Sequence, residues 1–127
     1  MNEEDLKART KQFALRVMKL VSALPQTTAG RAIGSQLVRS GTSVGANYRA
    51  ACRSRSKAEF VAKIGIVAEE ADESAFWLEL IVDGELMKHD LVMPLHKEAE
   101  ELTAIFTASG RTAKQNNRQS KIKNPQC

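Results

Sequence analysis

Residues 39–59 read RSGTSVGANYRAACRSRSKAE, with four arginines and one lysine among small residues and no carboxylate before Glu59. Small side chains allow a second backbone to approach closely. Guanidinium groups at this density favour phosphates, carboxylates or an acidic protein surface as partners. Ser56 and Glu59 form a capping-box pattern, which indicates that a helix begins there. This stretch therefore predicts a small-residue helix that ends in a basic turn.

Outside this stretch, apolar residues recur at alternating steps of four and three, the pattern of amphipathic helices. This periodicity predicts that Phe13, Val17 and Phe106 are among the side chains that face the core. The predicted helices span residues 3–24, 28–53, 57–86 and 89–108. Pro25 ends the first helix, and Gly110 is the expected end of the last. Aromatic residues are only 5% of the chain, so aliphatic side chains must supply the core. The predicted fold class is an all-α helical bundle.

Four glycines lie within the second predicted helix, at positions 30, 34, 41 and 45. Each costs up to about 1 kcal/mol relative to alanine inside a helix. They imply either a break near residues 40–42 or a close contact with another helix. We expect one long helix that is kinked or loosened near Gly41.

The last residues, 111–127, read RTAKQNNRQSKIKNPQC and contain one large apolar residue, Ile122. Such a segment buries too little to order itself, so we expect residues 1–110 to form the bundle and residues 111–127 to form a disordered basic tail. A tail of this composition is often inert, and it is also typical of a phosphate-binding arm.

The net charge of +4 is unevenly distributed along the chain. Residues 6–58 hold eleven basic residues and no acid, whereas residues 59–101 hold twelve acids and three lysines. This asymmetry indicates nucleic-acid binding or head-to-tail self-association. Alternatively, basic and acidic helices neutralise each other within one bundle.

The sequence provides little for catalysis or metal binding. Cys52 and Cys127 form no C-x-x-C pair, and neither His89 nor His96 follows a glutamate by three residues, as a di-iron bundle requires. No nucleotide-binding or nucleophile-elbow motif is present. We therefore expect no enzyme activity, cofactor or metal. The charged N-terminus and the lack of a long apolar run predict a soluble cytoplasmic protein.

Two functional hypotheses follow from the charged residues. In the first, a basic surface binds structured RNA through Arg39, Arg49, Arg53, Arg55 and Lys57. In the second, the protein is a structural or protein-binding scaffold, in which basic and acidic helices pair across subunit interfaces. The residues assigned to subunit contact or ion pairing are Asn47, Glu59, Glu69, Glu70, Glu73, Trp77 and Glu79. The hypotheses differ in whether the arginines stay accessible after assembly.

The run RSGTSVGANYRAACRSRSKAEFVAKIGIVAEEADESAFWLEL, from Arg39 to Leu80, closely resembles the four-helix bundle proteins encoded in intervening sequences of bacterial 23S ribosomal RNA genes. The resemblance covers about residues 6–108. Its matching positions are Arg39, Ser40, Ser43, Asn47, Arg49, Arg53, Ser56, Glu59, Glu69, Glu70, Asp72, Glu73, Trp77 and Glu79. Residues 47–51 depart from the family, because arginine and alanine replace an acid and a glycine.

The resemblance implies an antiparallel up-down bundle that assembles into a ring, with a homopentamer as the expected state. It attaches no enzymatic activity to the chain. The accessory proteins of diversity-generating retroelements are similar in fold, and that likeness implies binding of RNA and of a protein partner on a positively charged ring.

Overall fold

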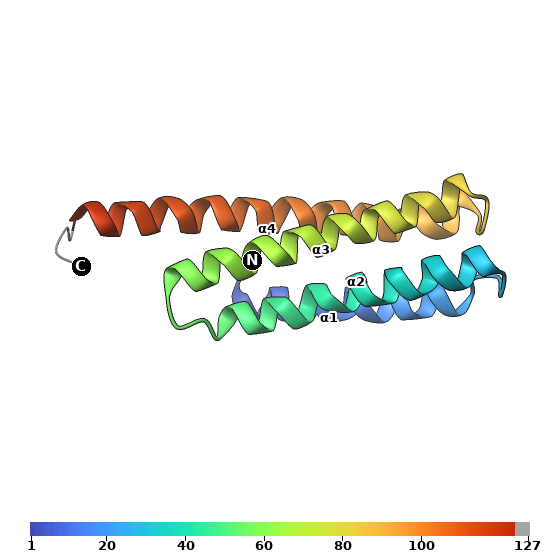
Figure 1. Cartoon of the computed structure of the whole chain (residues 1–127), viewed down its shortest axis with the longest axis horizontal. Coiled ribbons are helices and arrows are strands. Elements are labelled where there is room, and N and C mark those ends of the chain that lie inside the picture. Colours follow the sequence, from blue (N-terminus) through green and yellow to red (C-terminus); the bar gives the residue numbers. More distant parts are fainter. Residues whose placement is uncertain (124–127) are drawn as a thin grey trace.

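The structure is a computed structural model that describes residues 1–123 of the 127-residue chain. The described part contains four helices (Figure 1). They are α1 (Glu3–Ser22), α2 (Thr28–Cys52), α3 (Lys57–Asp83) and α4 (His89–Lys123). The predicted all-α four-helix architecture is confirmed.

The helices run alternately up and down, so the α2–α3 turn lies at the same end as the start of α1 and the C-terminal part of α4 (Figure 1). Helix α3 packs against both α2 and α4, and α1 packs mainly against α2. The contact between α1 and α4 is the smallest in the bundle. Helix α1 is therefore held in the bundle mainly by its contact with α2.

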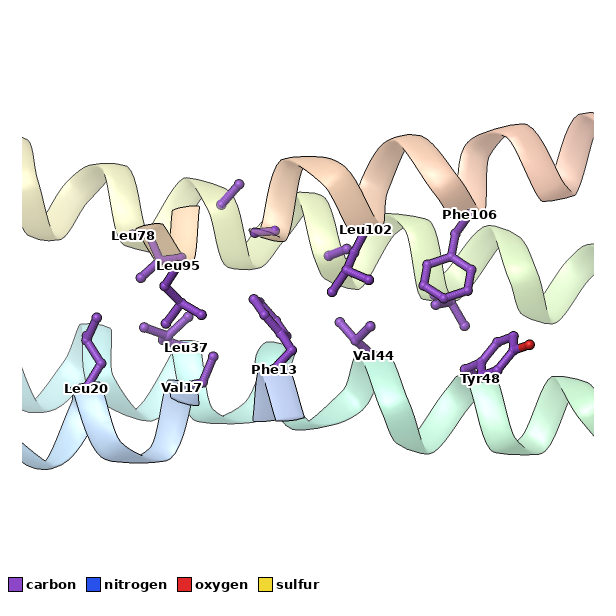
Figure 2. Close-up of a cluster of buried hydrophobic side chains, with 14 of the residues drawn as sticks. Phe13, Val17, Leu20, Leu37, Val44, Tyr48, Leu78, Leu95, Leu102 and Phe106 are labelled. Carbon is purple, nitrogen blue, oxygen red and sulfur yellow. The ribbon is translucent and has the colours of Figure 1, made fainter. Parts of the chain in front are cut away.

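The core is a single apolar layer between the helices, filled by side chains from all four (Figure 2). Helix α1 contributes Phe13 and Val17 to this core, and α2 contributes Leu37 and Val44. Phe106 lies against Tyr48 with ring centroids 5.2 Å apart, closing the core toward the end that holds the α2–α3 turn. The periodicity of the sequence therefore identified the inward faces correctly.

Helix α2 is continuous through the glycine-containing region, with no break at residues 40–42. A Cβ atom built on Gly41 would lie 2.8 and 2.9 Å from the two γ-carbons of Val17 in α1. A Cβ on Gly45 would lie 3.3 Å from Oγ1 of Thr10. The glycines thus permit the close contact of α1 and α2, which is the second of the two explanations that the sequence left open.

The helix caps follow the local sequence closely. Asn2 and Asp5 form a capping box for α1, and the side chain of Ser56 accepts a hydrogen bond from the Glu59 amide at the start of α3. Helix α3 ends at Asp83, three residues earlier than expected. Beyond it, Leu86 N donates to Ile81 O, and Glu85 adopts a left-handed conformation with φ of 58°. These are the features of a Schellman cap, and this motif ends the helix.

The fourth helix is much longer than the sequence indicated. We expected it to end at residue 108, with Gly110 as its stop and a disordered tail from residue 111. Instead, α4 continues through Gly110 to Lys123, and that expectation is wrong for residues 111–123. Gly110 does not take the positive φ of a C-terminal cap. The residues after it include good helix formers and no proline before Pro125.

The remaining part of the predicted tail, residues 124–127, lies outside the described residues. The division of the chain into a bundle domain and a separate tail at residue 110 stays a prediction. The continuous helix nevertheless joins the two segments directly, so the basic residues of the first part of the tail have defined positions beside the bundle.

Candidate nucleic-acid interface

Arg39 lies in the middle of α2 and pairs with two carboxylates of α3. Its Nη1 is 3.1 Å from Oε2 of Glu70, and its Nη2 contacts Oε2 of Glu73. The hydrogen bond to Glu73 raises the pKa of the Arg39 guanidinium. Arg39 therefore links α2 to α3 within one chain, and the two carboxylates neutralise its positive charge.

The arginines at the other positions of the predicted basic surface differ from Arg39. Arg49, Arg53 and Arg55 are exposed, and no ion pair joins their side chains to another residue of the described chain. Arg49 lies in the last turn of α2, and Arg53 and Arg55 lie in the α2–α3 turn. Lys57 is exposed at the first position of α3. We call this region, residues 49–57, the basic turn.

A groove of about 490 Å³ adjoins the basic turn. Ser54, Arg55 and Ser56 line one side of it, and Ala113 and Asn116 of α4 line another. Glu3 of α1 also borders the groove, and its carboxylate lies 3.8 Å from Nζ of Lys7. The groove therefore shows that the start of α1, the basic turn and the distal part of α4 meet in one place.

The predicted acidic residues are divided among several local roles. Glu59 accepts a hydrogen bond from the Arg55 amide and pairs with Lys63 at 2.9 Å, which lowers the pKa of its carboxyl. Glu79 lies 2.9 Å from Nε2 of the buried His96. Glu69 is exposed on α3. None of these carboxylates forms an ion pair with the guanidinium group of Arg49, Arg53 or Arg55 in the described chain.

Two further residues were expected to contribute to a subunit interface. Asn47 is half-buried, and its Nδ2 donates to the Ser43 carbonyl of the same helix at 2.8 Å. Trp77 is half-buried and packs edge-on against the exposed Phe76, with centroids 5.1 Å apart. The contacts of both residues lie within one chain, and an intersubunit role for them stays a prediction.

Sequence reasoning missed an ion pair that joins α1 to α4. Arg9 donates two hydrogen bonds of 2.7 Å to the carboxylate of Glu98 and lies 2.8 Å from Glu101. The hydrogen bond from Arg9 lowers the pKa of Glu98. These partners are about ninety positions apart in the sequence, so no local pattern connects them. The pair reinforces the least extensive contact between neighbouring helices of the bundle.

Cys52, which lines the groove, and Tyr48, in the last turns of α2, are not activated for chemistry. Burial raises the pKa of the Cys52 thiol, which keeps it protonated at neutral pH, whereas a nucleophilic cysteine needs a lowered pKa. Burial likewise raises the pKa of Tyr48. In residues 1–123, no group of His, Cys, Asp and Glu side chains has an arrangement that could hold a metal ion. No helix in that range is both long and apolar enough to cross a membrane.

The fold and its charged surface define the chain as an antiparallel four-helix bundle with a basic end. The model of the 23S rRNA-intervening sequence protein family matches residues 3–108, and the chain belongs to this family. A solved structure from Bacteroides thetaiotaomicron, described as a protein with unknown function from the S23 ribosomal protein family, is similar. It has a TM-score of 0.80 and 29% sequence identity, and the match covers 87% of this chain and 99% of that one. The search of curated proteins gave no match.

Proposed function

We propose that the protein is a non-enzymatic bundle that binds structured RNA through the basic turn. The observation that carries this proposal is the exposure of Arg49, Arg53 and Arg55 without an ion pair in the described chain. Unmatched guanidinium groups at one end of the bundle attract phosphates, because binding releases counterions from the nucleic acid. The family name, which refers to an intervening sequence of 23S rRNA, makes a ribosomal RNA hairpin the first ligand to test.

The surroundings of the basic turn favour folded RNA over an unpaired strand. Proteins that bind single strands usually stack bases on several exposed aromatic side chains. Tyr48, the aromatic residue next to Arg49, is 6% exposed and packs on Phe106. The basic turn therefore offers charge without a stacking surface, which suits recognition of an RNA backbone by its shape.

The RNA-binding proposal is tested by measuring affinity for a ribosomal RNA hairpin across a salt series with nuclease-treated protein. We expect Arg53→Glu/Arg55→Glu to weaken binding roughly 10- to 100-fold at about 0.1 M salt, because about two phosphate contacts are lost. Lys88→Glu/Lys97→Glu is the matched control, since both lysines are exposed and lie away from the basic turn. Wild-type protein that does not bind even at low salt would contradict the proposal.

We also propose that copies of the protein assemble into a closed ring. The expected number of five subunits comes from the family resemblance. Ile66 and Phe76 are 43% and 50% exposed on the outer face of α3, on the same helical stripe as Glu69 and Glu73. Exposed apolar residues among acids are typical of a subunit interface. A contact between two different surfaces builds a cyclic ring when the rotation between successive copies closes.

A complementary surface lies between α1 and α2. A groove of about 490 Å³ there has alanines and Gly45 along it and the basic side chains Lys7, Lys11 and Arg49 at its borders. The acidic, apolar stripe of α3 from a second copy would complement the basic side chains at the borders of this groove. Such pairing would bring Arg49 to the subunit contact. In the scaffold alternative, the assembly would cover Arg53 and Arg55 as well and leave the protein without affinity for RNA.

The assembly is tested by size-exclusion chromatography with light scattering at micromolar concentration. A pentamer would have about five times the 14.0 kDa mass of one chain. We expect Ile66→Ser/Phe76→Ser to shift the protein toward the single-chain mass. The control is Leu91→Ser, because Leu91 is 62% exposed but lies outside the α3 stripe. Wild-type protein with the mass of one chain would rule out the ring.

A further inference from the structure

The distal part of α4 presents a second basic surface. Arg111, Lys114 and Arg118 are exposed on this helix, and no ion pair joins them to another described residue. They are spaced by three and four residues, which places them on one side of the helix. The continuous helix fixes their spacing, unlike that of charges on a flexible chain.

Contacts that α4 makes nearer its N-terminus show which side of the helix carries these three cations. His96 lies against Glu79 of α3, so its direction marks the side of α4 that borders α3. Lys114 is 18 residues beyond His96, or about five full turns, and therefore points the same way. Arg111 and Arg118 lie within about 60° of that direction. The acids that pair with Arg9, by contrast, lie on the side of α4 that borders α1.

Helix α3 begins next to this part of α4. A Cβ on Gly110 would lie 3.6 Å from Cγ2 of Ile64. Because the two helices are antiparallel, Lys57 at the start of α3 lies level with about residue 117 of α4. Ala113 and Asn116, which line the groove, lie on a different side of α4 from the three cations. In Figure 1, α4 extends past the α2–α3 turn. The cations of α4 therefore continue the basic turn along the α3 side of the bundle and beyond its end.

We propose that Arg111, Lys114 and Arg118 form the second wall of the RNA-binding surface, with the basic turn as the first. This inference rests on the proposed function and extends it to a ligand class, which is base-paired RNA contacted along its phosphate backbone. Two groups of cations, one around the α2–α3 turn and one on α4, suit a rod of phosphates, and neither group includes an exposed aromatic residue for stacking. Charge complementarity identifies the ligand as a polyanion.

The test compares three proteins on a fully paired RNA hairpin across a salt series. Arg111→Gln/Lys114→Gln/Arg118→Gln removes the charges of the second wall and keeps good helix formers. We expect the slope of log affinity against log salt to fall by about two to three, since each phosphate contact contributes about 0.7 to 0.9. The matched control, Lys19→Gln/Lys88→Gln/Lys97→Gln, removes three exposed lysines away from these walls and should keep the wild-type slope.

A second variant tests whether the three cations of α4 bind RNA from a rigid helix or from a flexible segment. Ala113→Pro keeps every charge but breaks the helix between Arg111 and Lys114, because proline lacks the amide donor and clashes with the preceding turn. We expect at least a fivefold loss of affinity for the hairpin with the bundle still folded by circular dichroism. If Ala113→Pro bound the hairpin as tightly as the wild type does, the proposal that a rigid helix presents these cations would be wrong.

The two proposals fail in different ways. If Arg53→Glu/Arg55→Glu weakens binding but the triple glutamine variant keeps the wild-type slope, the second wall is wrong and the basic turn stands. If wild-type protein does not bind the hairpin, the proposed function itself fails. Equal affinity for the hairpin and for an unpaired strand of the same length would overturn the assignment to base-paired RNA. Equal loss in the lysine control would show a nonspecific effect of net charge.

Discussion

The middle of α2 and its C-terminal end carry the same kind of side chain in different settings. Arg39 reaches across to Glu70 and Glu73 of α3, whereas Arg53 and Arg55 extend from a turn with no carboxylate partner for their guanidinium groups in the described chain. Arg39 is itself an exposed residue, so exposure does not distinguish the two settings. What distinguishes them is the presence of acids on the neighbouring helix. A basic sequence predicts a basic surface only where those acids are missing.

The packing beneath these arginines differs as well. In the middle, Gly41 contacts Val17, and the buried hydroxyls of Ser40 and Ser74 lie 2.8 Å apart between α2 and α3. At the end, a groove separates the basic turn from α4. We therefore expect substitutions in the middle to change stability and substitutions at the end to change binding. Substitutions in the two regions test that separation.

The largest effect is expected from Phe13→Ala in the middle of the bundle. Phe13 is 1% exposed and lies between the helices (Figure 2). Its loss should lower the free energy of unfolding by about 3–5 kcal/mol, because a cavity replaces the ring. Urea unfolding followed by circular dichroism measures this. RNA affinity of the protein that remains folded should not change, and a parallel loss of affinity would break the separation.

A smaller loss is expected from Gly41→Ala. The new methyl group would overlap Val17, whose branched side chain cannot turn away easily, and the cost should be about 1–3 kcal/mol. Gly65→Ala is the matched control, since nothing lies within 4 Å of its added Cβ on α3. That control should stabilise the helix by about 0.5–1 kcal/mol. Thermal unfolding of both variants compares them, and equal shifts would contradict the close contact.

The pair between Arg9 and Glu98 predicts a dependence on pH. The lowered pKa of Glu98 means that the pair stabilises the folded protein above the usual glutamate pKa of about 4.3, and that this is lost as pH falls through the folded-state pKa. Glu98→Gln should therefore cost about 1 kcal/mol at pH 7 and nothing at strongly acidic pH. Unfolding measured at several pH values tests this, and a constant difference would argue against an ionic contribution.

The smallest effect is expected from Arg39→Gln. The substitution leaves Glu70 and Glu73 without their guanidinium partner, so the melting temperature should fall slightly, by less than in Gly41→Ala. Hairpin affinity should equal that of the wild type, in contrast to Arg53→Glu/Arg55→Glu. A loss of affinity in Arg39→Gln would show that the middle of α2 also contacts RNA and would erase the distinction between the two regions.

The sequence predicted much of the fold because its local signals agree. The four-three periodicity placed Phe13, Val17 and Phe106 in the core, and Ser56 with Glu59 marked the start of α3. The end of α4 was missed because glycine was read as a stop. A glycine ends a helix only when the chain adopts the left-handed conformation there, and the sequence of residues 109–111 does not determine that choice.

The candidate site was less predictable because its properties depend on contacts between distant residues. Arg39 and Arg53 look alike in the sequence, and only the packing of α2 on α3 gives one of them a carboxylate partner. The same holds for Arg9, whose partners lie on α4. The basic residues of α4 were noticed as part of a tail, but their alignment beside α3 required the helix itself.

An even number of antiparallel helices also has a practical consequence for experiments. Helix α1 begins, and the described part of α4 ends, at the end of the bundle that holds the basic turn (Figure 1). An affinity tag or fused fluorescent protein on the N-terminus would therefore stand beside the arginines and compete with any anionic ligand. The α1–α2 connection at residues 23–27 lies at the opposite end of the bundle, and it is the better place to attach a dye or a sensor surface.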